Sequence, residues 1–100
     1  MYAVYIIECA DGTLYTGITT DLPRRFAQHQ AGTAAKYTRA HGARRIAYQE
    51  EAPSRSAALV REAAIKKLPR REKLALIGRF RRGGRAPEQA AHEHATEHAQ

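Results

Sequence analysis

The sequence predicts an α/β (α+β) fold, in which a small, three-stranded, mainly antiparallel sheet is flanked by helices in β-β-α-β-α-α order. Residues 1–9 are apolar on both alternations, as expected of a central strand that is covered on both faces. A turn signal at Asp11 and Gly12 follows, and then the alternating segment 13–20, which together indicate a hairpin. Residues 54–80 have helical composition. A chain of 100 residues supports one domain with a modest core.

The register of this hairpin depends on the length of its loop. A two-residue turn would place Tyr5 and Tyr15 on opposite faces of the sheet. A three-residue loop, with Gly12 in the left-handed region, pairs Tyr5 with Gly17 and Tyr15 with Ile7. Both rings then lie on one face as diagonal neighbours, roughly 7 to 8 Å apart.

The first predicted helix covers residues 22–30, because Asp21 is a good N-cap, Pro23 suits the first turn and Gly32 is a natural stop. Residues 32–45 hold many basic and few apolar side chains and are predicted to form a connecting loop.

The C-terminal half of the domain is predicted to contain one strand and two helices. Residues 45–52, RIAYQEEA, have strand composition, and Pro53 and Ser54 end that strand. Residues 54–68 form a helix that ends before Pro69, and residues 70–80 form a last helix. Leu74, Ile77 and Phe80 are expected on or near its apolar side.

Residues 1–82 are predicted to form the domain and residues 83–100 a disordered polar tail, because no large apolar side chain follows Gly83. No segment has the length of a membrane span or the layout of a signal peptide, so we expect a cytoplasmic protein with no membrane partner. The single Cys9 lies at the end of the apolar first strand, where a buried, inert thiol is expected.

The charge balance favours a polyanionic partner. Seventeen Lys and Arg residues against ten Asp and Glu residues give a formal charge of +7. Nucleic acid, and DNA in particular, is the expected partner.

Arg25 and His29 lie one helical turn apart, so both can face a common point. An arginine offers a bidentate fork to a phosphate, and a neutral histidine can accept a proton. A solvated Arg and His on an exposed helix face is the alternative interpretation.

Tyr5 and Tyr15 are also open to two interpretations. Aromatic residues are ordinary strand residues that pack well in small sheets. A tyrosine becomes a candidate general base where nearby positive charge lowers its pKa, and the basic helix face supplies such charge.

Glu62 is either the partner of Lys66, one turn further along the helix, or a ligand of Mg²⁺. Magnesium tolerates a single protein carboxylate when water and substrate phosphate fill its other positions. No cluster of carboxylates accompanies Glu62, so a single ion, Mg²⁺ or Mn²⁺, fits better than two.

Basic residues gather around one aromatic residue in the connecting loop. Such a mixture suits backbone phosphates and a stacked base, although solvated loop charge is an alternative. The candidate nucleic-acid-binding residues are Lys36, Tyr37, Arg39, Arg44 and Arg45. The tail holds His92, His94 and His98, which lack the fixed geometry of a metal site.

Taken together, these motifs resemble the GIY-YIG nuclease family, especially its small bacterial stand-alone single-domain members. The stretches AVYII and LYTGIT stand where the family has its Gly-Ile-Tyr and Tyr-Ile-Gly signatures. DLPRRFAQH carries the family's Arg and the following His, and REAAIKKL its metal-ligand Glu. AKYTRA and REKLALI add to the similarity, which covers most of residues 1–80.

The resemblance implies that Tyr5 and Tyr15 position or deprotonate the attacking water with help from His29, and it leaves open which tyrosine is the base. Arg25 would stabilise the phosphate, and Glu62 would hold the divalent ion. Gly17 would leave room for the Tyr5 ring.

The expected function is divalent-metal-dependent hydrolysis of nucleic-acid phosphodiester bonds by an endonuclease, with a role in DNA repair or recombination. One alternative is a nucleic-acid-binding module of the same fold that cleaves weakly or not at all. Another is a partner-binding protein whose positive charge only aids solubility.

Overall fold

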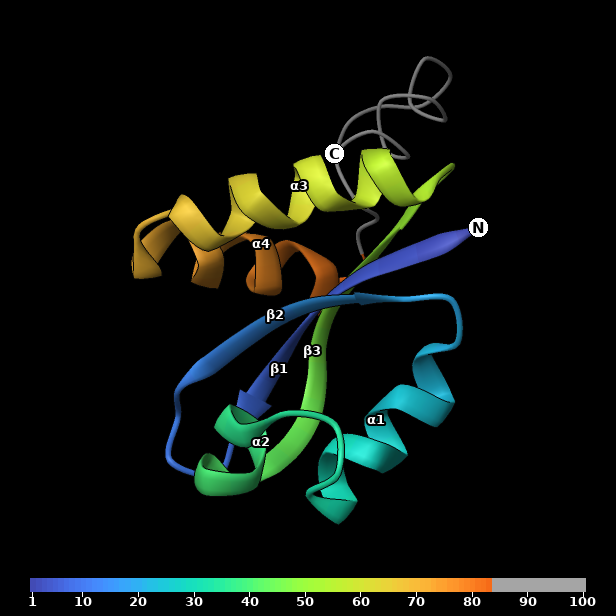
Figure 1. Cartoon of the computed structure of the whole chain (residues 1–100). Helices are drawn as coiled ribbons and strands as arrows, with labels where there is room; N and C mark the ends of the chain where they lie inside the picture. The colour runs from blue at the N-terminus through green and yellow to red at the C-terminus, as the bar shows by residue number, and fades with distance from the viewer. Residues whose placement is uncertain (84–100) are drawn as a thin grey trace.

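The computed structural model describes residues 1–83 (Figure 1). Within that range the elements follow in the order β1 (Tyr2–Cys9), β2 (Leu14–Thr19), α1 (Leu22–Ala31), α2 (Lys36–His41), β3 (Ala43–Ala52), α3 (Arg55–Lys67) and α4 (Arg70–Arg81). The sheet is antiparallel with strand order β2-β1-β3, so β1 is central, as its continuous apolar sequence predicts. The predicted α+β class is confirmed.

The β1–β2 hairpin has the three-residue loop and not the two-residue turn. Gly12 adopts a φ of 86°, and its N–H donates to the carbonyl oxygen of Cys9. Tyr5 is opposite Gly17 and Ile7 is opposite Tyr15. The predicted register is therefore confirmed, and both tyrosines belong to the same face of the sheet.

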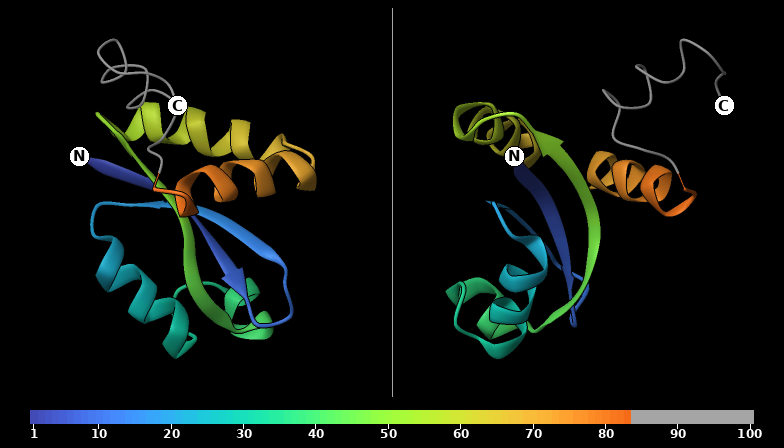
Figure 2. Two further views of the ribbon diagram at one scale, coloured as in Figure 1. Left: turned by 180° about the vertical axis from the view of Figure 1, so that it is seen from behind. Right: turned by 90° about the vertical axis from the view of Figure 1, so that its right-hand side faces the viewer.

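The two faces of the sheet support separate cores. Val4 and Ile6 of β1 pack with buried residues of α3 and α4, including Ile65 and Ile77. The intervening side chains of β1 pack with Leu22 and Phe26 of α1 on the other face. Figure 2 shows α4 on the opposite side of the strands from α1 and α2, whereas α3 lies across one end of the sheet. This placement lets α3 approach residues on the α1 face as well.

Helix α2 was not predicted, because the sequence indicates a loop over residues 32–45. Its six residues are basic and polar, and its N-cap, Ala35, makes no side-chain capping bond. Local sequence therefore supports this helix weakly. Tertiary contact compensates, since Thr38 of α2 is buried and hydrogen-bonded to His29 of α1. The element order is thus β-β-α-α-β-α-α, and β3 begins at residue 43, earlier than predicted.

The helix ends otherwise follow the sequence signals closely. Asp21 accepts a hydrogen bond from the backbone N–H of Arg24, and Gly32 ends α1 with a φ of 81°. On α4, Ile77 is buried and Phe80 packs against the core, but Leu74 is exposed, and Leu76 is buried instead. The expectation for Leu74 was wrong because the helix presents positions 76 and 77 to the sheet.

Cys9 is a free, buried cysteine, and burial raises the pKa of its thiol. Within residues 1–83, no helix combines the length and apolar character that a membrane crossing needs. The predicted tail and its three histidines, His92, His94 and His98, lie beyond the described residues, apart from Gly83.

Candidate active site

The centre of the candidate site is a buried pair formed by Tyr5 of β1 and His29 of α1. The Tyr5 hydroxyl oxygen lies 2.8 Å from Nε2 of His29, and each residue is only 2% exposed. Burial raises the pKa of Tyr5, and the nearby Tyr15 and Glu62 add to this effect, whereas Arg25 opposes it. Burial and the charge of Arg25 both lower the pKa of His29 below its ordinary value of 6.5. At neutral pH the pair is therefore a neutral phenol beside a neutral imidazole.

Gly17 of β2 gives the Tyr5 ring its place. A Cβ atom at position 17 would lie 2.6 Å from the Tyr5 hydroxyl oxygen and 2.8 Å from its Cζ atom. Tyr15, two residues earlier, packs its ring edge to face against His29 with centroids 5.1 Å apart. The close approach of Tyr5 to β2 thus requires glycine, as the register predicts.

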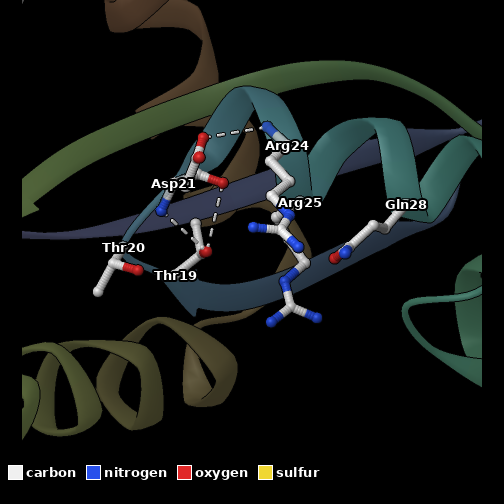
Figure 3. Close-up of a pocket in the computed structure, with 6 residues that line it drawn as sticks. All are labelled: Thr19, Thr20, Asp21, Arg24, Arg25 and Gln28. Carbon is white, nitrogen blue, oxygen red and sulfur yellow. Dashed lines mark hydrogen bonds between the residues drawn. The ribbon is translucent and has the colours of Figure 1, made fainter.

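Arg25 lies near the Tyr5–His29 pair, and it also lines a neighbouring cavity of about 230 Å³ (Figure 3). The cavity lies where β2 leads into α1 and is lined by Thr19, Thr20, Asp21, Arg24, Arg25 and Gln28. Figure 3 shows Arg24, Arg25 and Gln28 extending from α1 toward the same space. Among residues 1–83, no carboxylate forms an ion pair with either arginine. Two guanidinium groups are therefore available to an anion at this position.

Glu62 of α3 is close enough to Tyr5 for its charge to raise the pKa of the phenol. Its side chain is 18% exposed, and it also forms an ion pair with Lys66 at 3.3 Å. Glu62 thus makes the helical ion pair, and it is also close enough to Tyr5 for its charge to act on the phenol.

The site suits a single divalent ion and not a preformed metal cage. In residues 1–83, no three His, Cys, Asp or Glu side chains come together as a possible metal site. Glu62 offers a hard, half-buried carboxylate, which is a ligand type that Mg²⁺ accepts singly when substrate phosphate and water supply the rest. The donor set therefore fits an ion that binds together with substrate.

A row of aromatic rings leads outward from His29. Tyr15 lies between His29 and Tyr37 of α2, whose ring centroid is 5.8 Å from that of Tyr15. Tyr37 stacks on His41 with centroids 4.2 Å apart, and its side chain is 38% exposed. Nδ1 of His41 lies 2.5 Å from a carboxylate oxygen of Asp11, and this hydrogen bond lowers the pKa of the Asp11 carboxyl. The row thus ends in a partly exposed ring that is stacked on its neighbour.

The basic residues predicted to bind nucleic acid lie on two elements. Lys36 and Arg39 are exposed on α2, which also carries Tyr37, and Arg44 and Arg45 lie near the start of β3. Nε of Arg45 donates to a carboxylate oxygen of Glu8 at 2.6 Å, so this arginine already has a partner. Of the four, Lys36 and Arg39 thus share helix α2 with Tyr37.

The structure brings Tyr5, Tyr15, Arg25, His29 and Glu62 into one region from β1, β2, α1 and α3. Sequence reasoning missed Thr38, whose hydroxyl oxygen lies 2.7 Å from Nδ1 of His29. A lone threonine in a basic segment gives no signal of such a contact, because its partner is nine residues away on another helix.

Comparison with known proteins shows which family this chain belongs to. Residues 1–75 match the GIY-YIG catalytic domain. A UPF0213 protein from Streptococcus sanguinis is 54% identical over 74 residues, which cover 74% of this chain and 85% of the relative. A UPF0213 protein from Halobacterium salinarum is 51% identical over 77 residues, 77% of this chain and all of the relative.

The fold is also similar to a solved structure. The solution NMR structure of a UPF0213 protein from Bacillus halodurans has 44% sequence identity and a TM-score of 0.50, and the similarity covers 78% of this chain and 84% of that one. GIY-YIG domains are typically endonucleases that depend on divalent metals and bind nucleic acid, whereas the names of these relatives specify no activity. The chain therefore belongs to the GIY-YIG catalytic domain family and has a nuclease-type fold.

Proposed function

We propose that this protein is a Mg²⁺- or Mn²⁺-dependent endonuclease that hydrolyses phosphodiester bonds of DNA, with a role in repair or recombination. The proposal rests on the buried hydrogen bond between Tyr5 and His29, next to Arg25, which has no carboxylate partner within residues 1–83. A nucleophilic water needs a proton acceptor, and the scissile phosphate needs positive charge. These residues supply both within one region.

In this proposal the proton of the attacking water passes to Tyr5 as Tyr5 gives its own proton to Nε2 of His29. The raised pKa of Tyr5 means that the phenol keeps its proton unless an acceptor takes it, and His29 is neutral and in contact. Tyr15 is less buried than Tyr5 and packs against His29, so we assign it the positioning of the water.

Arg25 is proposed to bind the non-bridging oxygens of the phosphate, where its charge stabilises the negative charge that develops in the transition state. Glu62 would hold the divalent ion, which supplies Lewis-acid charge at phosphate oxygens when it is bound. Arg24 and Gln28, in the cavity beside Arg25, extend the polar surface toward the next phosphate of the strand.

The exposed side chain of Tyr37 and the exposed cations Lys36 and Arg39 of the same helix are proposed to bind the nucleic acid outside the scissile bond. An aromatic face held in place by stacking on His41 suits one unpaired base, and the cations suit backbone phosphates. Arg44 and Arg45 are proposed as further phosphate contacts, with Arg45 exchanging its Glu8 partner for DNA.

Nicking of supercoiled plasmid and of branched DNA with Mg²⁺ tests the proposal. We expect the natural protein to nick, and Glu62→Gln and Arg25→Gln to lose nicking by roughly a hundredfold or more while binding is largely kept. Arg71→Gln on α4 is a matched control at an exposed arginine, and should nick normally.

Full nicking by the Glu62 and Arg25 variants would reject these roles. Salt-sensitive binding without nicking by the natural protein would favour the alternative of a nucleic-acid-binding module. Absence of binding at low salt would reject a nucleic-acid partner.

A further inference from the structure

Both ring nitrogens of His29 make hydrogen bonds, and only the contact at Nε2 takes part in the proposed proton transfer. Nδ1 lies 2.7 Å from the hydroxyl oxygen of Thr38, a residue of α2 that is only 1% exposed. The Thr38 hydroxyl in turn lies 3.3 Å from the carbonyl oxygen of Ala35, to which it donates. A chain of contacts therefore runs from Tyr5 through His29 and Thr38 to the backbone of α2.

Counting protons selects one arrangement of this chain. A neutral imidazole carries one N–H, and each hydroxyl carries one proton. With the proton on Nδ1, Tyr5 donates to Nε2, Nδ1 donates to Thr38, and Thr38 donates to Ala35, so every proton has an acceptor.

The other tautomer satisfies fewer groups. With the proton on Nε2, the ring donates to Tyr5 and Thr38 must turn its proton toward Nδ1. The Tyr5 proton then has no acceptor among residues 1–83, although Tyr5 is almost fully buried. A buried donor without a partner costs about 1–3 kcal/mol. This cost favours the Nδ1–H tautomer.

We propose that Thr38 is a positioning residue that holds His29 in the Nδ1–H tautomer and so keeps Nε2 free to accept the Tyr5 proton. The catalytic meaning of this assignment rests on the proposed function, but the tautomer itself does not. The assignment also gives α2 a role, since this short helix, weakly supported by its own sequence, is what brings Thr38 to His29.

The same contact remains favourable after proton transfer. When His29 becomes an imidazolium, both ring nitrogens are donors, and Thr38 is already oriented as an acceptor. The other groups near His29 are the hydroxyl of Tyr5 on β1, the ring of Tyr15 on β2 and, on α1 itself, the charge of Arg25. Of these, the Arg25 charge disfavours the imidazolium, so the Thr38 oxygen is the contact that offsets it.

Nitrogen-15 NMR of the His29 ring, in protein without DNA or metal, tests the tautomer directly. Above the His29 pKa, we expect a protonated Nδ1 and an unprotonated Nε2 in the natural protein. Thr38→Val should move the signals toward the other tautomer or a mixture, and Thr38→Ser should restore the original pattern. Thr33→Val is the matched control, because the Thr33 hydroxyl donates to the exposed end of α1 at the carbonyl of Gln28.

Single-turnover nicking provides the catalytic arm of the test. Thr38→Val should slow the reaction roughly tenfold to a hundredfold, the range typical of lost partners behind a functional histidine, and Thr38→Ser should recover most of the rate. A protonated Nε2 in the natural protein would overturn the proposal, and this measurement requires no variant to fold. An unchanged tautomer in folded Thr38→Val would overturn it as well.

The two proposals fail separately. If the ring shows the expected tautomer while Tyr5→Phe nicks at the natural rate, the proposed proton route is wrong and the assignment of Thr38 as a positioning residue for His29 stands. If Tyr5→Phe loses nicking while the tautomer is Nε2–H, the assignment of Thr38 is wrong and the proposed endonuclease stands.

Discussion

Two buried tyrosines on opposite faces of the same sheet carry very different networks. Tyr48 of β3 donates to a carboxylate oxygen of Glu50 at 2.5 Å, and the other oxygen accepts from Nε of Arg61 at 2.8 Å. The hydroxyl oxygen of Tyr5 on β1 instead lies 2.8 Å from Nε2 of a neutral imidazole, that of His29. Burial raises the pKa of both phenols. The same residue type in the same sheet is thus placed in a charged network and in a neutral one.

The Tyr48 and Tyr5 networks differ in whether the charged groups in or beside them already have partners. The charge of Glu50 is balanced by Arg61, so no group of that network needs a further partner. The ion pair also connects β3 to α3. The network around Tyr5 has no ion pair, ends at a backbone carbonyl and stands beside Arg25, which has no carboxylate partner within residues 1–83. We infer that the first network stabilises the fold and that the second is free to move a proton next to an anion.

Replacement of each tyrosine by phenylalanine should separate the two roles most strongly. Tyr5→Phe removes the proposed proton acceptor, so single-turnover nicking should fall roughly a hundredfold or more. Tyr48→Phe leaves Glu50 paired with Arg61, so nicking by the folded protein should stay within about threefold. Equal effects of the two substitutions on nicking would remove the distinction between the faces.

Stability should show the reverse order. Glu50→Ala leaves the buried Tyr48 hydroxyl and the Arg61 guanidinium without their partner, which should lower the free energy of unfolding by about 2–3 kcal/mol. Urea unfolding measures this, with Glu51→Ala on the same strand, at an exposed position, as the control. The triple variant Tyr48→Phe, Glu50→Leu and Arg61→Met, which leaves no member of this network unpaired, should regain most of the loss. A destabilisation no greater than that of the control would contradict a stabilising role.

Glycine substitutions sharpen the contrast within the Tyr5 face. Gly17→Ala places a Cβ atom 2.6 Å from the Tyr5 hydroxyl oxygen, so the ring must move away from His29 and nicking should fall. Gly12→Ala is strained by its φ of 86° and should cost about 1–2 kcal/mol of stability, but its Cβ would contact nothing within 4 Å. Normal nicking by folded Gly17→Ala would show that the position of Tyr5 is not critical.

The smallest effect concerns the outer surface of the same face. Arg39→Gln on α2 should reduce the slope of log affinity for duplex DNA against log salt by about 0.9 if it removes one phosphate contact. Arg71→Gln on α4, on the opposite side of the sheet, should leave the slope unchanged. Fluorescence anisotropy over a range of salt concentrations measures both. A larger change for Arg71 would place DNA on the other face.

The fold could be predicted in large part because its signals are local. The turn signal at Asp11 and Gly12 locates the hairpin and leaves two registers, of which the structure has the one with the three-residue loop, and the caps at Asp21 and Gly32 fix the ends of α1. The opposition of Tyr5 and Gly17 follows from that register alone. Helix α2 could not be predicted, because its burial comes from a tertiary contact between Thr38 and His29.

The candidate site could be predicted only as a set of residue types. Helical spacing indicates that Arg25 and His29 share a face, but it does not show that His29 is buried and bonded to Tyr5. The approach of Glu62 depends on how α3 crosses the end of the sheet, which no local pattern encodes. Tyr5 and His29 are neutral mainly because they are buried, and their burial depends on the tertiary fold.

A pH titration of His29 shows whether the neutral imidazole is the group that accepts the Tyr5 proton. Its pKa is lowered by burial and by Arg25, so the neutral ring persists below pH 6.5 and is lost as pH falls through the folded pKa. We predict that an NMR titration of the His29 ring gives a pKa below 6.5, and that nicking with saturating DNA falls at acid pH as His29 gains its proton. Nicking that persists at full rate after His29 has become an imidazolium would show that the neutral ring does not accept the Tyr5 proton.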